Sequence, residues 1–200
     1  MEEAPQRRIE LPPIADPAPL GLAAFALTTF LLSAHNAGWT DGGAAWLGFA
    51  FAYGGLAQFS AAMWEFRNRN VFGATAFGTY GTFWIGLGLY VLLAEAGSAN
   101  PLNDLGWILL AFAIFNTYML LWSTRVNMSV FLVFATLEVT EIILFIGFFS
   151  STAEPNGIVK IGGVVGIITA LVAWYASAAG VVNGMAGRQV LKVGSPLWKE

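Results

Sequence analysis

Long apolar stretches separated by short polar connections dominate the sequence. Windows of about 20 residues with little or no charge recur six times, and a helix of that length crosses a bilayer core of roughly 30 Å. The breaks between them hold turn-forming or charged residues, as in residues 67–70 and 152–157. The pattern predicts an all-α membrane protein. Its bundle of six transmembrane helices would span about residues 19–38, 44–66, 72–94, 105–124, 127–150 and 158–184.

The segment before the first apolar window predicts where the first helix begins. Asp16 is a residue type that often caps a helix amino terminus. Pro17 suits the first turn, where the missing amide hydrogen costs nothing. We therefore expect Asp16 to be the N-cap and Pro17 to be the first helical residue.

The composition agrees with a membrane location and excludes several classes of function. Hydrophobic residues make up 57% and charged residues 10% of the 200 positions, whereas soluble domains carry about 25% charged residues. The chain has no cysteine and one histidine, which argues against a disulfide framework and a metal centre. It shows no catalytic nucleophile with an adjacent base, phosphate-binding glycine loop or basic nucleic-acid stripe. We expect no enzyme activity, no cofactor and no nucleic-acid partner.

The basic residues gather on one side of this topology. Eight of the nine flank the first span, the last span, or the connections between spans two and three and between four and five, and Lys160 alone lies on the other side. The positive-inside rule then places both termini in the cytoplasm. We expect a multi-pass protein of the cell (plasma) membrane with polar tails at residues 1–15 and 188–200. Residues 1–15 lack the apolar run of a signal peptide.

Polar side chains recur at helical spacing inside two of the predicted spans. Thr29, Ser33 and Asn36 are spaced i, i+4 and i+7, so they share one face of a helix, and the threonines of residues 75–82 repeat this spacing. Such hydroxyls can bond to carbonyls of their own helix, or they can line a path for a small polar solute. Two stripes on separate helices favour the path. The candidate path residues are Thr29, Asn36, Gln58, Thr79 and Tyr80.

Two acidic residues, Glu138 and Glu141, lie inside the fifth predicted span. Counted from Arg125, Glu138 is about 13 residues into the membrane, near the bilayer middle at ~1.5 Å per residue. An ionised carboxylate at that depth costs at least a few kcal/mol, so each acid needs a proton, a partner or water. Their i, i+3 spacing permits a shared proton, and both a proton relay and a structural role stay open. Glu65 and His35, near span ends, are expected to contact water at the interface.

Several short motifs carry a resemblance to one family of membrane proteins. The segment Asp16-Pro-Ala-Pro-Leu-Gly-Leu22 resembles the Asn-Pro-Ala-Pro-Leu-Gly-Leu signature of the acetate uptake transporter family. That family includes bacterial succinate/acetate permeases and yeast ammonia/acetate exporters. The resemblance covers about residues 15–190 and is strongest in the first three spans. Further matching motifs are Thr28-Thr29, His35-Asn36, Tyr53-Gly-Gly55 with Gln58, and Phe72-Gly-x-Thr-Ala-Phe77 followed by Tyr80-Gly-x-Phe-Trp84.

The resemblance implies a six-helix protomer in a homohexameric ring, with a path in each protomer for acetate, succinate and related small carboxylates. Family members are described as anion channels or as proton-coupled carriers, with a hydrophobic constriction midway along the path. The matching motifs place its aromatic members at Phe25 and Tyr53, and its aliphatic member is assigned to Leu137. Residues 16–187 would then form the transport domain.

Two features depart from the family pattern. Asp16 replaces the usual asparagine, which keeps a capping side chain but adds a negative charge at the cytoplasmic mouth of the path. Such a charge would repel a carboxylate unless the helix amino terminus or an arginine offsets it. Glu138 and Glu141 stand where apolar residues are expected. Beside an anion path they would be protonated, turned toward a subunit interface, or part of proton coupling.

Two other functions fit parts of the pattern. Urea and short-chain amide channels also form rings of six six-helix proteins, and neutral polar stripes would serve urea equally well. The proline-rich motif before the first span favours the acetate family instead. The second alternative is a membrane sensor or assembly protein that transports nothing. A purely structural bundle would have little reason to align polar stripes on facing helices.

Overall fold

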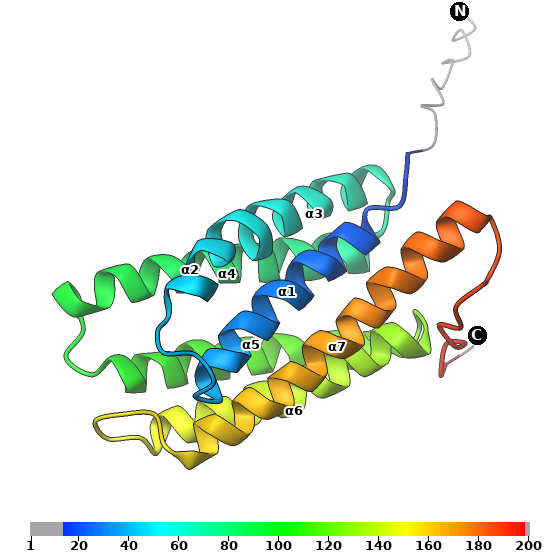
Figure 1. Ribbon diagram of the computed structural model, residues 1–200. Coiled ribbons are helices and arrows are strands. Elements are labelled where there is room, and N and C mark those ends of the chain that lie inside the picture. Colours follow the sequence, from blue (N-terminus) through cyan, green and yellow to red (C-terminus); the bar gives the residue numbers. More distant parts are fainter. Residues whose placement is uncertain (1–13, 199–200) are drawn as a thin grey trace, which may run out of the picture.

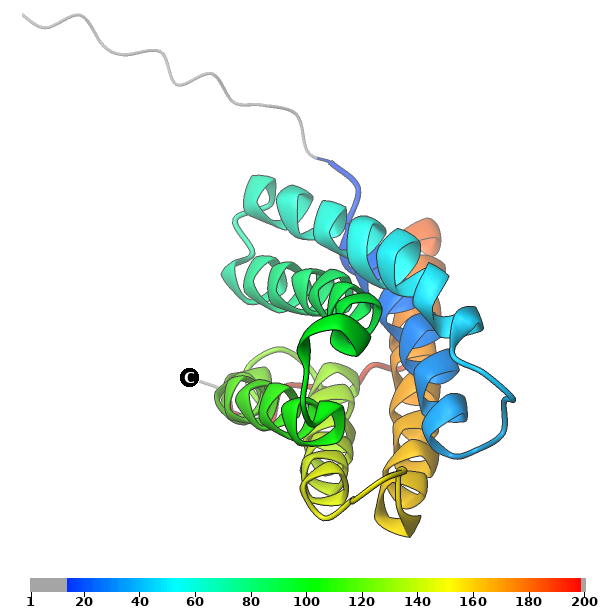
Figure 2. The ribbon, with the colours of Figure 1, turned by 90° about the vertical axis from the view of Figure 1, so that its left-hand side faces the viewer.

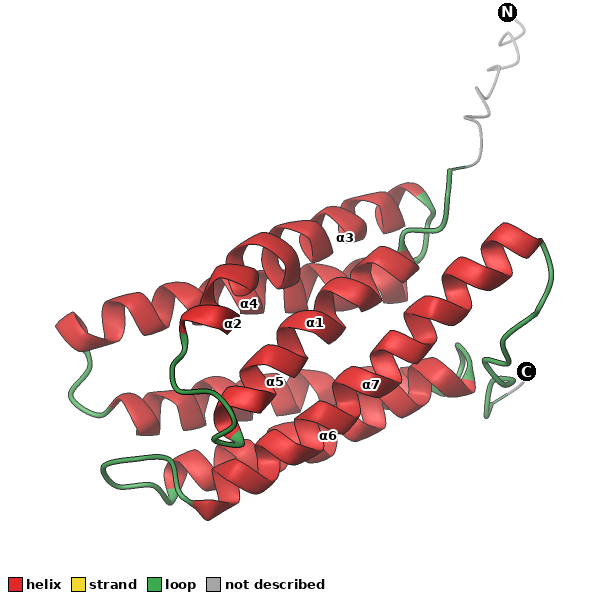
Figure 3. Cartoon of the chain, in the orientation of Figure 1, coloured by secondary structure: helices red, strands yellow, loops and turns green. Residues whose placement is uncertain are grey.

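The computed structural model describes residues 14–198, and the regular structure in this part of the chain is all helical (Figure 3). The predictions for residues 1–13 and for Lys199 lie outside the described residues. In chain order the helical elements are α1 (Ala18–Asn36), α2 (Ala44–Phe49), the π-helical segment η1 (Ala50–Ala57), α3 (Gln58–Arg67), α4 (Val71–Gly97), α5 (Pro101–Ser123), α6 (Met128–Phe149) and α7 (Gly157–Ala186).

Five of the described helices, α1, α4, α5, α6 and α7, are long and apolar enough to cross a membrane. Their bounds agree with the first and the last four predicted spans to within a few residues. The described part of the chain is thus all-helical, as predicted, and five of its helices meet the length and apolar composition that a membrane-spanning helix requires. The count of six spans depends on the segment between α1 and α4.

That segment, residues 44–67, is helical without interruption but changes its winding in the middle. Its central part, η1, is a π-helix, a form that is rare and often occurs at functional sites. A Cβ atom added at Gly54 would lie 2.8 Å from Thr28 Cβ and from Trp84 Cγ. Glycine therefore allows η1 to approach α1 and α4 more closely than any other residue would.

The start of α1 differs from its prediction by one residue. The N-cap is Pro17, and Pro19 lies in the first turn. The Asp16 carboxylate still accepts a hydrogen bond from the backbone N–H of Ala18, at 2.9 Å. The expectation that Asp16 itself is the N-cap is thus wrong by one position. Four later helices follow a capping asparagine whose side-chain oxygen accepts a backbone N–H, namely Asn70, Asn100, Asn127 and Asn156.

The helices lie side by side in a bundle in which α1 and α7 pack along each other (Figure 1). These two helices bridge the α3 and α4 pair to the α5 and α6 pair (Figure 2). Small residues on α7 permit the approach, because Gly163 and Gly166 lie directly against Ser33 and its backbone. The Ser177 hydroxyl also donates a 2.7 Å hydrogen bond to the Pro19 carbonyl. This packing fixes the position of α1 inside the bundle.

We expect Gly166→Leu to destabilise the protein by about 1–3 kcal/mol, the usual cost of overpacking. A Cβ atom at Gly166 would lie 3.1 Å from Ser33 Cβ and 3.2 Å from Thr140 Cγ2, so the larger side chain must push α1 away from α7. Thermal unfolding in detergent measures the change. Gly184→Leu is the matched control, since Gly184 is on the same helix with no atom within 4 Å of an added Cβ. Equal melting temperatures for the two variants would contradict this account of the α1 and α7 contact.

Residues 188–198, predicted as a tail, run back along the bundle. Val193 O accepts a hydrogen bond from the Ser129 backbone N–H at 2.9 Å. Thr124 O accepts one from Leu197 N–H, also at 2.9 Å. The Arg125 guanidinium lies 4.6 Å from the centre of the Trp198 ring, close enough for a cation–π contact. The tail is thus attached to the connection between α5 and α6.

Candidate functional site

Three cavities follow one another along α1. Residues 18–25 of that helix line the first cavity, residues 25–36 line the middle cavity, and residues 32–36 line the third. Neighbouring cavities share lining residues, so together they form one series through the bundle. The first and middle cavities share Phe25, Tyr80 and Leu137, and the middle and third share Leu32, Asn36, Leu109 and Leu144.

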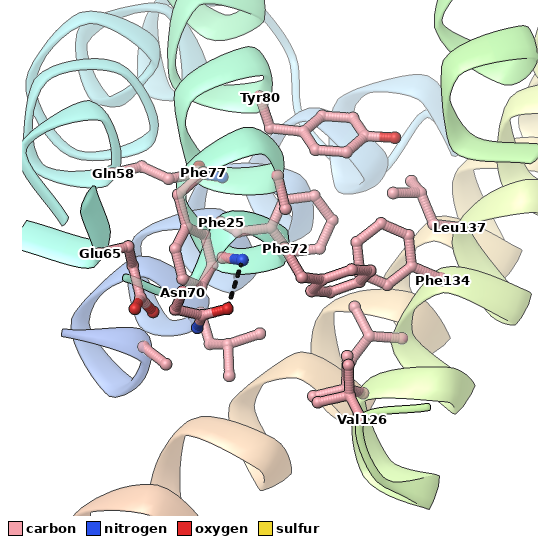
Figure 4. A pocket seen from close by; sticks show the side chains of 16 residues that line it. Phe25, Gln58, Glu65, Asn70, Phe72, Phe77, Tyr80, Val126, Phe134 and Leu137 are labelled. Carbon is pink, nitrogen blue, oxygen red and sulfur yellow. Dashed lines mark hydrogen bonds between the residues drawn. The ribbon is translucent and has the colours of Figure 1, made fainter. Parts of the chain in front are cut away.

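Phe25, Tyr80 and Leu137 separate the first cavity from the middle one. All three side chains are buried and belong to one apolar cluster. The rings of Phe25 and Tyr80 meet edge to face, with centroids 5.8 Å apart, and Figure 4 shows both rings together with Leu137 at the first cavity. The three residues come from α1, α4 and α6, which are distant in sequence. They form the apolar boundary that the first and middle cavities share.

Tyr53, expected as the aromatic partner of Phe25, lies elsewhere. It is half-buried on η1 and is absent from the described linings of the three cavities. The buried residues of η1 are Ala50, Gly54 and Gly55, so the segment presents its small residues to the rest of the bundle. The structure therefore places Tyr80 beside Phe25 in the position expected for Tyr53.

The structure brings most of the candidate path residues to the cavities. Thr29, Asn36 and Tyr80 line the middle cavity, and Gln58 lines the first. Thr79 is half-buried and is absent from the described linings of the three cavities. Four buried polar oxygens lack a hydrogen-bond partner among the described residues, and they lie on Thr29 and Glu141 in the middle cavity and on Gln58 and Glu65 in the first.

Glu65 corrects one expectation about the interface. Its side chain is 1% exposed and lines the first cavity with Gln58 and Asn70 (Figure 4). The prediction of a water-exposed interfacial residue is wrong, because the packing of α3 against α4 turns this position inward. His35 is half-buried, with Nδ1 3.3 Å from Thr40 Oγ1, and lines the third cavity.

A hydrogen-bond network centred on Asn116 joins Tyr80 to the two acids. Asn116 Nδ2 donates to Glu138 Oε2 at 2.6 Å and to the carbonyl oxygen of Phe134 at 3.0 Å. Its Oδ1 accepts the Tyr80 hydroxyl at 3.0 Å, and the same hydroxyl oxygen lies 3.3 Å from Glu141 Oε1. Asn116 is fully buried, so the network lies in the interior where α4, α5 and α6 meet.

Comparison with known proteins identifies the family. Residues 3–193 match the GPR1/FUN34/yaaH family, which is nearly the whole chain. The chain belongs to this family. The resemblance to the acetate transporters drawn from the motifs of the first three spans is thereby confirmed.

Named relatives in the GPR1/FUN34/yaaH family include fungal and bacterial proteins. The chain is 38% identical over 193 residues to acetate permease A of Emericella nidulans, covering 88% of this chain and 65% of that protein. It is 34% identical over 183 residues to the succinate-acetate/proton symporter SatP of Escherichia coli K12, covering 90% of this chain and 96% of that protein. The chain thus spans slightly less than two thirds of the fungal relative and nearly all of the bacterial one.

A solved structure in the family has the same fold. The structure of the bacterial acetate channel SatP superposes with a TM-score of 0.84 at 34% sequence identity, covering 91% of this chain and 100% of that chain. The arrangement of helices described above is therefore that of a known membrane channel. The named relatives are transport proteins, as expected for a chain without a catalytic constellation.

Sequence reasoning missed Asn116 and its neighbour Thr117. Thr117 Oγ1 donates to Glu138 Oε1 at 2.7 Å, so the two adjacent residues satisfy both oxygens of that carboxylate. The signal was an amide and a hydroxyl side by side within the apolar run of residues 105–124. Polar residues at that depth are costly and need partners, and here the partner is the acid on the next helix.

Proposed function

We propose that this protein transports acetate and related small carboxylates, including succinate, across the membrane along the three cavities of α1. The observation that carries the proposal is that Phe25, Tyr80 and Leu137 line both the first and the middle cavity, and we take them as the apolar narrowing of the path. A transport path needs spaces on both sides of a barrier, and a purely structural bundle does not. The names of the two relatives supply the substrate class.

The chemistry of the cavities suits a small carboxylate. Acetate has one methyl group for the aromatic narrowing and two oxygens for hydroxyl and amide donors. On one side of the narrowing Gln58 offers an amide, and on the other Thr29 and Asn36 offer a hydroxyl and an amide. The middle cavity, with a volume of about 40 Å³, has room for a few water-sized groups, which suits an acid of four heavy atoms. These residues would replace part of the hydration shell during passage.

We also propose that residues 44–67 form a sixth membrane span. Together α2, η1 and α3 are long enough to cross a hydrocarbon core of roughly 30 Å. The first cavity is lined by Ala18, Asn70 and Val126, so the start of α1 and the two arginine-containing connections share one end of the bundle. The positive-inside rule then makes this end cytoplasmic, with both termini there and the protein in the plasma membrane.

The proposed assembly is a homohexamer, and a polar pair on the outside of the protomer supports self-association. Thr117 is exposed and Glu138 is half-buried, and both lie well inside their spans. Lipid would leave this carboxylate without water at membrane depth, whereas a neighbouring protomer would cover it. The expected assembly contacts therefore run along α5 and α6.

Transport by purified protein in liposomes tests the proposed function. We expect labelled acetate to enter protein-containing liposomes severalfold faster than empty ones, at a pH where acetate is ionised and the lipid alone passes little. The pH gradient and the membrane potential are varied separately, so that an anion channel and a proton-coupled carrier give different driving forces. Urea serves as a comparison solute. Uptake of urea but not acetate would favour an amide channel, and no uptake of either would favour a sensor or assembly protein.

A further inference from the structure

The middle cavity holds two buried oxygen atoms that have no hydrogen-bond partner among the described residues. They are Glu141 Oε2 and Thr29 Oγ1, and both residues line the cavity. Glu141 is 3% exposed and Thr29 is 6% exposed, so bulk water does not satisfy these atoms. Buried polar atoms are almost always hydrogen-bonded, because an unmade bond costs the full desolvation of the group. The two atoms therefore point to a ligand that binds between them.

The hydrogen-bond network shows where the hydrogen of Glu141 is needed. Asn116 Nδ2 donates to the Phe134 carbonyl, which fixes the amide orientation and turns Oδ1 toward Tyr80. An amide oxygen only accepts, so the single hydrogen of the Tyr80 hydroxyl is used for Asn116. The contact between the Tyr80 oxygen and Glu141 Oε1, at 3.3 Å, then needs a hydrogen from Glu141. A protonated Glu141 completes the network, and a carboxylate anion does not.

The charges around Glu141 agree with an uncharged side chain. None of the residues that line the middle cavity is lysine, arginine or histidine. The titratable groups facing this region are Tyr80 on α4, Glu138 one turn away on α6, and Tyr118 on α5. The helices α1 and α7 contribute neutral side chains there. A second acid nearby and the absence of a cation in the lining both oppose a negative charge on Glu141.

We propose that Glu141, in its uncharged form, binds the carboxylate of the transported acid in the middle cavity by sharing its proton with it. When the substrate binds, the carboxyl group rotates so that its proton, which faces Tyr80 in the free protein, lies between Glu141 and one oxygen of the substrate, and the Thr29 hydroxyl donates to the other oxygen. A carboxylic acid and a carboxylate form a strong, charge-assisted hydrogen bond of this kind. The inference rests on the proposed function, since it needs a carboxylate to enter the cavity.

The shared proton links binding to proton movement. When a substrate that entered from the third cavity leaves toward the first cavity as the neutral acid, the proton goes with it and Glu141 becomes a carboxylate. Glu141 then regains a proton from water in the third cavity, which adjoins the middle one at Asn36. One substrate and one proton have then moved in the same direction, and the only bonds that change are the O–H bonds of the transferred proton. Glu141 thus makes the path a proton-coupled one.

Infrared difference spectra of the purified full-length protein, recorded with and without isotope-labelled acetate, test this directly. We expect the wild type to show the carbonyl band of a protonated carboxyl group, and acetate to shift that band. Glu141→Gln is expected to lose the acetate-sensitive band and to bind acetate about tenfold more weakly. Glu138→Gln, changed one turn away on the same helix, is expected to keep the acetate-sensitive band. Thr29→Val is expected to keep it too, while binding acetate more weakly.

The outcomes separate this inference from the proposed function. A wild-type protein that transports acetate without a protonated carboxyl band that responds to acetate would overturn the role of Glu141 alone. An acetate-sensitive band that persists in Glu141→Gln, or that disappears in Glu138→Gln, would overturn it as well. A wild-type protein that neither binds nor transports acetate would reject the proposed function and this inference together. Size-exclusion elution at the wild-type position establishes that each variant is folded.

Discussion

Phe25→Ala is expected to raise the flux of acetate about tenfold, which corresponds to a barrier lower by about 1.4 kcal/mol. The Phe25 ring packs edge to face on Tyr80 and forms part of the wall between the first and middle cavities. Truncation joins these two spaces, so a solute keeps more of its hydration while passing. Larger acids, such as benzoate, should pass the variant although they pass the wild type poorly. Initial rates of uptake into liposomes measure both effects.

Phe30→Ala is the matched control for this change. Phe30 lies on the same helix and packs on Trp174, with ring centroids 5.4 Å apart, outside the three described cavities. It should cost stability without widening the path. Unchanged flux and selectivity in Phe25→Ala would remove this residue from the barrier. An equal rise in both variants would indicate general loosening of the bundle.

The helices of the transmembrane bundle were predictable because their cause is local. A spanning helix needs about 20 apolar residues in a row, and this requirement is visible in a single segment. The same holds for the helix starts, since an asparagine before an apolar run marks a cap, as at Asn127 and Asn156. The error at Asp16 is equally local, because Asp16 and Pro17 are adjacent and both residue types suit a helix start.

The choice of Tyr80 over Tyr53 was not predictable from periodicity. Both tyrosines lie in apolar segments beside glycines, and each matches a family motif. The distinction comes from how η1 and α4 turn their faces toward α1, which the π-helical winding of η1 alters. At Gly54 this segment lies directly against Thr28 and Trp84, which belong to other helices. Tertiary packing therefore decides which ring meets Phe25.

The two acids illustrate the same division between local and long-range information. Their spacing and depth could be read from the chain, and so could their need for a proton, partner or water. Their separate environments could not, because Glu138 is satisfied by side chains of α5 whereas Glu141 meets Tyr80 of α4 and a cavity. Although the two acids are only three residues apart, Glu138 lies toward α5 and the protomer surface, whereas Glu141 lines the middle cavity.

Asn116→Leu is expected to destabilise the protein by about 2–4 kcal/mol. A single interhelical hydrogen bond in a membrane protein is worth about 0.6 kcal/mol on average. Here the change removes three bonds of one amide, to the Tyr80 hydroxyl, the Phe134 carbonyl and one carboxylate oxygen of Glu138, and an unmade bond in the interior costs about 1–3 kcal/mol. Thermal unfolding in detergent measures the loss.

Thr117→Val is the matched control for Asn116→Leu, and it should cost about 1 kcal/mol or less. It removes one bond to the same Glu138 carboxylate and leaves the bonds of the buried Asn116 amide in place. A loss in Asn116→Leu no greater than in Thr117→Val would contradict a central role for the amide. The amide also holds the Tyr80 ring against Phe25, so Asn116→Leu should increase acetate flux as well as lower stability. If flux and stability change together only at Asn116, the network that binds the α4, α5 and α6 helices also holds the barrier closed.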